Sequence, residues 1–358
     1  MAYQDVKIPR FYINALEYNL ETANTAFNGQ WNWGVNLHSQ IRTLPVNPLT
    51  FEQDDMGWVD GFVMGHIASP FSGYVAILGH NMATVNSQYG IQSETTNQDM
   101  SLTSLVNGVA AGDAQIAPGN DGFSIATINN AIGGYEKFAF KIYGSNAPNI
   151  GSIVIGTYYE MKNLPNLSLT MSRDYGSTKE ITTMNGSSVS NTMWNSAPKW
   201  GNLGAWEIND PTIDTISIQS LSRSGRRTWQ LKFSFMDSGD LWGPNQMVLN
   251  KSIDGNYYVP FFGNESELEQ TDIQGGSQGY LFNFMDDDNF FSQVWQKTVG
   301  GTLPFLFQPN KDDNTQFSIA RFKNSTLKAT QSAFNVYDIS VSIAVSYTHL
   351  RAHETGRN

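Results

Sequence analysis

The chain has 358 residues, of which 40% are apolar and 15% charged, whereas about a quarter of the residues in a typical soluble domain are charged. The formal net charge of −11 argues against a nucleic-acid-binding surface, because phosphate contacts need clustered Lys and Arg. The absence of cysteine excludes a disulfide framework, a thiolate nucleophile and a Cys-ligated metal. Aromatic residues make up 13% of the chain, which favours β-sandwiches joined by ordered loops over helical bundles.

The N-terminal segment lacks the features of a targeting sequence. Residues 1–18 contain no uninterrupted apolar region and no small-residue cleavage pattern, so we expect no signal peptide. No apolar run approaches the roughly 20 residues that cross a bilayer, so we also expect no membrane span.

Residues 1–57 are predicted to form an irregular N-terminal arm, because much of this stretch is rich in Asn, Pro and Gly. One short strand is expected at residues 8–14. Trp31 and Trp33 are candidates for glycan contact, since aromatic faces stack on sugar rings. The favoured alternative is that both indoles pack the arm onto its neighbour.

Residues 58–162 contain short apolar, β-branched or aromatic segments separated by turn-rich ones. The predicted strands are residues 61–68, 73–82, 123–132, 136–144 and 151–161. Strands at this spacing, without helical patterns, are typical of a sandwich or jelly roll. The phrases AILGHN and FKIYGSNAPNIGSIVIGTYYEM resemble the discoidin or galactose-binding-like family of jelly rolls. That resemblance implies a module that binds sugars through loops at one end of the sandwich.

Residues 163–220 are expected to connect two parts of the chain. The polar, turn-rich stretch 171–191 predicts one hairpin. The stretch 194–206 holds three tryptophans among Gly, Pro and Asn. We favour indoles that fill a seam between domains, and a tryptophan-lined ligand groove is the alternative.

The clearest strand signal lies in residues 221–237, LSRSGRRTWQLKFSFMD. Its period-two alternation predicts a half-buried strand. The residues expected on the buried face are Trp229, Leu231, Phe233 and Phe235. The turn expected before the strand carries three basic residues that are candidates for a subunit interface: Arg223, Arg226 and Arg227. Arg226 and Arg227 could bind a carboxylate of the next subunit bidentately, or could be solvated in the turn.

The last part of the chain predicts a long excursion, one helix and three strands. The excursion at residues 239–280 is rich in Gly and Asn, and a connection this long is usually functional. The helix is predicted at residues 287–299, capped by an Asp run and ended by Gly300 and Gly301. The strands are predicted at residues 302–310, 316–324 and 333–345.

This order of elements carries a second resemblance. RSGRRTWQLKFSFMD, DNFFSQVWQKTVGGTLPFLFQPN, QFSIARF and NVYDISVSI resemble structural tail proteins of tailed bacteriophages, in particular tail-tube-like and distal-tail-like proteins. The match covers residues 165–345 or so. It implies a β-sandwich with one covering helix, whose edges join copies into a ring around the tail axis. The N-terminal half, larger than in such proteins, would be an outward decoration.

The resulting prediction is a mainly β chain in four parts. They are an irregular arm (1–57), a galactose-binding-like jelly roll (58–162), a tail-tube-like β-sandwich (163–345) and a non-native tail (346–358). The last part is predicted because residues 345–358 resemble a translated sequencing adapter, as in a metagenomic fragment cut off mid-strand near residue 344.

The expected function is that of a virion structural protein of the tail, made in the host cytoplasm and assembling with copies of itself and other tail proteins. The alternative is a carbohydrate-binding adhesin that recognises a host surface glycan. No nucleophile elbow, Walker loop, HExxH or EF-hand pattern occurs, so we expect no enzyme, cofactor or metal. Asp286, Asp287 and Asp288 fit a helix cap better than a calcium loop. His80, at a strand end, fits a capping role better than a functional one.

Overall fold

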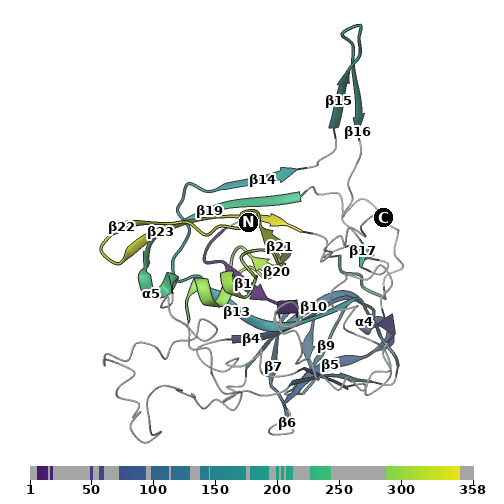
Figure 1. Cartoon of the computed structure of the whole chain (residues 1–358). Helices are drawn as coiled ribbons and strands as arrows, with labels where there is room; N and C mark the ends of the chain where they lie inside the picture. Colours follow the sequence, from purple (N-terminus) through teal and green to yellow (C-terminus); the bar gives the residue numbers. More distant parts are fainter. Residues whose placement is uncertain are drawn as a thin grey trace, which may run out of the picture.

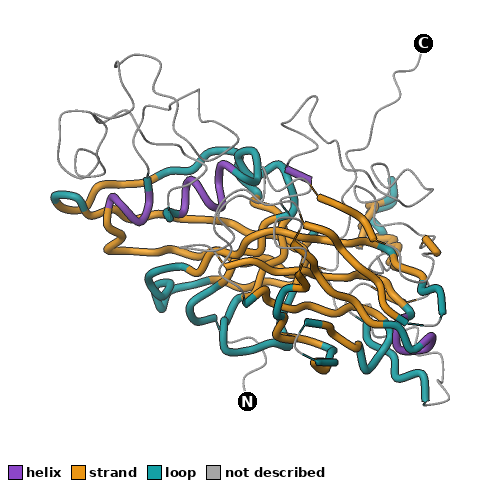
Figure 2. Tube along the Cα trace, turned by 90° about the horizontal axis from the view of Figure 1, so that it is seen from below, coloured by secondary structure: helices purple, strands orange, loops and turns teal. Residues whose placement is uncertain are grey.

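The computed structural model describes residues 6–14, 17–18, 49–50, 56–59, 72–93, 98–112, 114–129, 138–144, 146–174, 178–192, 199–200, 203–204, 207–212, 226–242 and 288–346. In these residues the protein is mainly β, and every strand pair in the described sheets is antiparallel (Figure 1). Figure 2 shows a body of strands with a few short helical turns. The predicted β-sandwich class is therefore confirmed. The jelly-roll connectivity of residues 58–162 stays a prediction.

The main sheet has eleven strands, ten of them in one continuous path. In spatial order these are β14 (Thr170–Asp174), β19 (Arg226–Asp237), β23 (Val336–Val345), β21 (Ser318–Phe322), β20 (Phe305–Gln308), β1 (Arg10–Ile13), β13 (Ser152–Glu160), β4 (Ser72–His80), β10 (Gly122–Ile128) and β7 (Leu102–Val106). The eleventh, β22 (Ala329–Ala333), pairs with β23.

A second sheet of six strands lies beside the N-terminal half of the main sheet (Figure 1). Its strands are β3 (Met56–Val59), β11 (Phe138–Tyr143), β5 (Gln88–Ser93), β9 (Gln115–Ala117), β8 (Val109–Ala110) and β6 (Gln98–Asp99). The Tyr89 hydroxyl on β5 and the Ser124 hydroxyl on β10 lie 2.8 Å apart and join the two layers. The short helix α4 (Met82–Val85) follows β4.

Three small strand pairs complete the described β structure. They are β2 (Leu49–Thr50) with β12 (Asn149–Ile150), β15 (Thr178–Thr182) with β16 (Ser188–Thr192), and β17 (Lys199–Trp200) with β18 (Leu203–Gly204). The remaining helical segments are α5 (Ser238–Leu241) and the π-helix η1 (Phe291–Gln296).

Strand β1 confirms the short strand expected at residues 8–14, but its position was not foreseen. It pairs with β13 through Arg10 and Glu160, and with β20 through Arg10 and Gln308. The main sheet thus runs without a break through residues of the predicted N-terminal segment (1–57) and of both predicted sandwiches. The division into separate domains stays a prediction.

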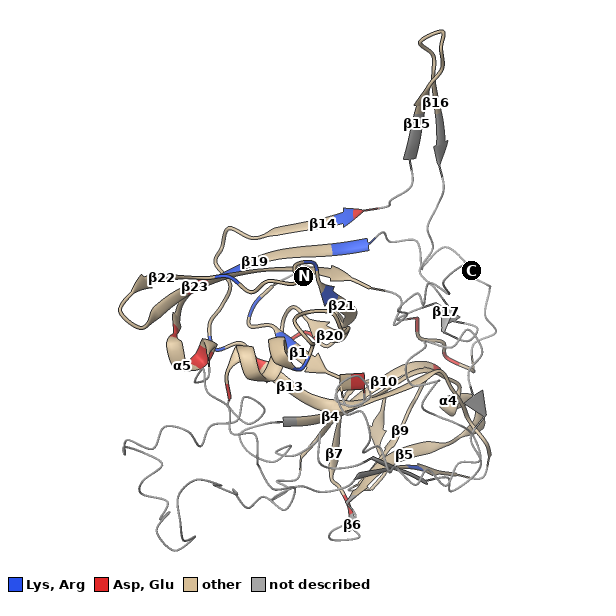
Figure 3. Cartoon of the chain, viewed as in Figure 1, with Lys and Arg blue, Asp and Glu red and all other residues tan. Residues whose placement is uncertain are grey.

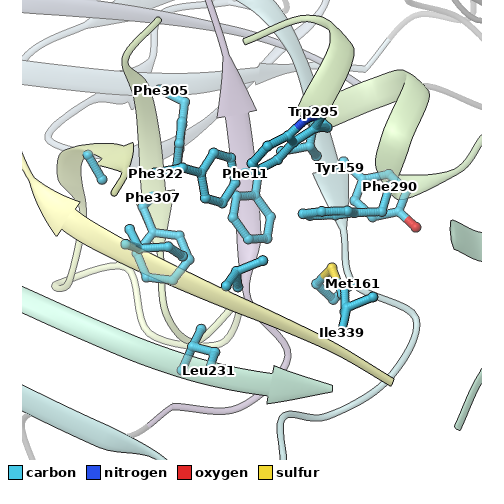
Figure 4. Close-up of a cluster of buried hydrophobic side chains, with 14 of the residues drawn as sticks. Phe11, Tyr159, Met161, Leu231, Phe290, Trp295, Phe305, Phe307, Phe322 and Ile339 are labelled. Atoms are coloured by element: carbon cyan, nitrogen blue, oxygen red, sulfur yellow. The ribbon is translucent and has the colours of Figure 1, made fainter. Parts of the chain in front are cut away.

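The core of the C-terminal half forms where the main sheet curls around η1. Rings from β1, η1, β20 and β21 meet there (Figure 4). Phe11 lies 5.3–5.9 Å, centroid to centroid, from four other rings, those of Phe290, Phe305, Phe307 and Phe322. Trp229 and Trp295 belong to the same cluster, as expected for one β-sandwich core covered by one helix.

Strand β19 follows the predicted alternation up to Phe233 and then departs from it. Trp229, Leu231 and Phe233 are buried, whereas Phe235 is 80% exposed and Met236 is fully buried in its place. The prediction for Phe235 was wrong because the register with β23 shifts between Phe233 and Met236. This bulge inserts an extra residue and reverses the faces, and Phe235 takes a positive φ of 60°.

The helix predicted at residues 287–299 is shorter than expected, and its turns are the wider turns of a π-helix. Its regular part is the π-helix η1, and the amide of Ser292 donates to the Asn289 side chain at 2.8 Å. Asp288 forms a 2.8 Å ion pair with Lys162, and Asp286 and Asp287 of the predicted cap lie outside the described residues. Gly300 and Gly301 follow with φ of 64° and 84°, the left-handed conformation that ends a helix.

Candidate assembly surface

The end of the main sheet path at β14 is an open edge. All five residues of β14 are exposed, and β19 is the strand it pairs with in the described part of the chain. Its sequence, TMSRD, has one apolar side chain, Met171. An edge strand presents unpaired N–H and C=O groups, which makes it a template for pairing with another chain.

Strands β15 and β16 form a hairpin, here called the arm, that follows β14 in sequence and stands out from the body (Figure 1). This confirms the hairpin predicted in residues 171–191. Its turn is closed by the Thr183 amide, which donates to the Ser187 carbonyl at 2.8 Å, and by Gly186 at a φ of 74°. Ile181 and Val189 face each other across the strands.

The arm carries apolar side chains that the rest of the described chain leaves uncovered. Ile181 and Val189 are more than half exposed, and Met184 in the turn is fully exposed. A two-stranded hairpin is at best marginally stable in water on its own. An arm with this exposed apolar surface is therefore suited to packing against another molecule.

Four further exposed apolar side chains, here called the end patch, belong to the segments away from the arm. They are Leu164 and Leu167 before β14, Phe235 near the end of β19 and Phe334 before β23, with exposed fractions from 58% to 102%. Backbone contacts fix these positions. The Asn163 side chain donates to the Phe235 carbonyl at 3.0 Å, and the Ser238 amide donates to the Asn335 carbonyl at 3.0 Å.

The two ends of the open edge also differ in charge (Figure 3). At the arm end, Arg173 on β14 lies opposite Arg227 on β19, and Asp174 lies opposite Arg226. At the patch end, the carboxylates of Asp237, Asp240 and Asp288 surround α5. Partial burial raises the pKa of Asp240, and the neighbouring carboxylates of Asp237 and Asp288 add to this against the opposing effect of Lys162. These three carboxylates stand against one lysine, Lys162, so the formal charge of this group is negative.

The predicted interface arginines are placed differently from the expectation. Arg226 and Arg227 belong to β19 rather than to a turn before it. Arg226 is exposed, and its Nε donates to the Val345 carbonyl at 2.5 Å. Arg227 donates to the Ser318 hydroxyl and lies 5.3 Å from the centre of the Trp229 ring. The turn expected at both residues is therefore wrong, although Arg226 is exposed to solvent, and their role in a subunit interface stays a prediction.

Other predicted site residues fall elsewhere. Arg223, Trp31 and Trp33 lie outside the described residues, as do 347–358 of the predicted non-native tail. His80 is buried, and its Nδ1 accepts from the Met82 amide at 3.2 Å. Burial lowers the pKa of His80 to about 3, so the imidazole is neutral and joins strand β4 to α4, as the favoured interpretation predicts.

A shallow polar groove of about 580 Å³ lies on the outer face of β14, β19 and β23. Its lining is mostly hydroxyl, amide and lysine side chains, including Ser168, Thr170, Gln230, Lys323 and Ser342. No aromatic ring lines this groove, so it has no face on which a sugar ring would stack.

The described residues contain no group of three or more His, Cys, Asp or Glu that could hold a metal ion. None of the helices in the described ranges is long and apolar enough to span a bilayer. No protein-family model matches the chain, and searches of curated proteins and of solved structures find no similar protein.

Proposed function

We propose that the chain is a structural subunit that assembles with copies of itself into a ring or tube, as part of the tail of a bacteriophage virion. The observation that carries this proposal is the open edge together with the arm beside it. β14 offers a fully exposed strand next to the 12-residue strand β19. The arm then continues from the same edge. β14 is short and carries Arg173 and Asp174, two features that limit pairing at an edge, so the exposed apolar side chains of the arm beside it are the stronger sign of a partner.

The assignment to a phage tail comes from the order of elements in residues 165–345. The anchor strand β19, the helical segment η1 and the strands β20, β21 and β23 come in the order that the resemblance implies, with the additional strand β22 between β21 and β23. The packing of η1 against the sheet, in the core around Phe290 and Trp295, is consistent with it. In this proposal the other tail proteins are further partners.

Electron microscopy and sedimentation velocity of the purified chain test this function. Rings or tubes of uniform diameter are the expected result. A single monomeric species at every concentration reached would contradict assembly.

The second candidate function is a glycan-binding adhesin. It is favoured by the way β4 and β10 lie buried between the core and the second sheet, as in a two-layer sandwich of the jelly-roll kind. A glycan array would show saturable binding to a defined sugar. Uniform absence of binding across host surface polysaccharides would remove this candidate without affecting assembly.

A further inference from the structure

The arm and the end patch lie toward opposite ends of strands β14 and β19. Leu164 and Leu167 precede β14, and the arm follows it. β19 is 12 residues long, so at about 3.3 Å per residue its ends are roughly 40 Å apart. Figure 1 shows the arm beyond the Asp174 end of β14 and the β22–β23 turn, which carries Phe334, at the other end of the sheet. A single copy therefore cannot bring its described arm onto its own patch.

The two surfaces match in chemistry. The arm offers Ile181, Met184 and Val189, and the patch offers two leucines and two phenylalanines. Aromatic and aliphatic side chains of this size are the usual anchors of protein interfaces.

The charges beside these surfaces match as well. Arg173 and Arg226 are exposed where the arm begins, whereas Asp237 and Asp240 lie beside the patch. If one copy is shifted along the edge direction, its arginines approach the carboxylates of the copy that it meets. Opposite potentials at two contacting surfaces steer and orient association.

We propose that the arm of one copy docks on the end patch of the next copy, with the arginines at the base of the arm facing the aspartates around α5. This inference rests on the proposed self-assembly and names its contact. Because the two surfaces differ, the contact is heterologous, so repetition produces a closed ring or an open filament. It also gives the assembly a direction, which pairing of two identical edges would not.

Thiol crosslinking tests the contact directly, because the chain has no cysteine of its own. Met184→Cys in one preparation and Phe334→Cys in another are mixed and treated with a short bismaleimide. The matched control replaces Phe334→Cys by Val109→Cys, since Val109 is 68% exposed but lies in the second sheet, away from the patch. The expected result is a covalent dimer in the first mixture, at least about tenfold above the control, as for a specific contact.

The outcomes separate the two proposals. Rings or tubes without excess crosslinking of Met184→Cys to Phe334→Cys would overturn the docking of the arm and leave self-assembly intact. A protein that stays monomeric at every concentration and forms no crosslink would overturn both.

A second measurement compares how strongly variants of the two surfaces associate. Replacing Ile181, Met184 and Val189 together by Ser should weaken association by about tenfold or more, because interface anchors are each worth over about 1 kcal/mol. Val109→Ser should leave it unchanged. Added salt should also weaken the contact. The single change Asp240→Arg should weaken it by placing like charges together, and the double change Arg226→Asp with Asp240→Arg should restore it. Equal assembly of all these folded variants would overturn the docking.

Discussion

Strands β4 and β14 belong to the same sheet but differ in pairing and in exposure. β4 pairs on both sides, with β10 and β13, and Gly73 to His80 are all buried. β14 pairs on one side, and all five of its residues are exposed. The sequences differ accordingly, with YVAIL in β4 and TMSRD in β14. The interior strand therefore has both of its backbone edges paired within one copy, whereas β14 has one edge without a strand partner in the described part of the chain.

The largest expected effect is in the interior. Phe11 is fully buried among four other rings, so Phe11→Ala should lower the free energy of unfolding by about 3–5 kcal/mol. The matched change on the arm, Ile181→Ala, should change it by less than about 0.5 kcal/mol, because that side chain is mostly exposed. Chemical denaturation of both variants, under conditions that keep them monomeric, measures the difference. Similar losses would mean that the arm is part of the folded core.

The next effect concerns a buried charge. Lys297 is buried, its Nζ donates to the Gln293 Oε1 at 2.7 Å, and burial lowers its pKa to about 8. An unfolded chain keeps a lysine pKa near about 10.4. Between these values the unfolded state binds more protons than the folded state, so stability rises with pH.

We expect the free energy of unfolding to rise by about 1–2 kcal/mol between roughly pH 7.5 and 9.5, and Lys297→Met to remove this rise. Tyr12 and Tyr89, whose pKa values are raised by burial, act in the opposite direction only above about pH 10. Urea denaturation at several pH values measures both profiles. A variant that keeps the full rise would show that Lys297 is not its source.

A smaller loss of stability is expected when the residues before η1 are changed, and it should differ between Asn289 and Asp288. Asn289→Ala removes the acceptor of the Ser292 amide and should cost about 1–2 kcal/mol. Asp288→Ala breaks a partly exposed ion pair with Lys162 and should cost less than about 1 kcal/mol. Thermal denaturation ranks the two variants. The reverse order would restore the acidic cap that the sequence suggested.

The smallest effect on folding is expected at the end patch. Phe235 is exposed at positive φ, a conformation that Asn accepts more readily than Phe. Phe235→Asn should therefore keep the free energy of unfolding within about 0.5 kcal/mol, whereas association should weaken. Parallel denaturation and sedimentation experiments measure the two quantities. A large loss of stability would place Phe235 with the interior rather than with the edge.

Local patterns predicted the strands that lie in continuous apolar or alternating runs. β4, β10, β11 and β13 fall within their predicted ranges or match them closely. The reversal at Phe235 was not predictable in this way, because it depends on the pairing of β19 with β23, about a hundred residues later. The signal for the β22–β23 turn was present at Asn335, a residue type that accepts the positive φ it adopts there.

The candidate surface was less accessible from the sequence than the strands were. The hairpin was predicted, but the sequence does not show that β14, the strand before it, lies at the end of the main sheet. The end patch combines residues near 165, 235 and 334, and these come together only through the order of strands in the sheet. The cap at Asn289 was missed because three aspartates stand directly before it, and local preference does not decide between neighbouring acceptors.

The place of β1 between β13 and β20 has a consequence for biosynthesis. Its partners include Glu160 and Gln308, so β1 must wait until residue 308 has been synthesised before its second neighbour is complete. Contacts so distant in sequence slow folding, and in the meantime the side of β1 that pairs with β20 has no partner. In the proposed assembly, copies that meet before translation ends would encounter an unfinished sheet, so association should follow release.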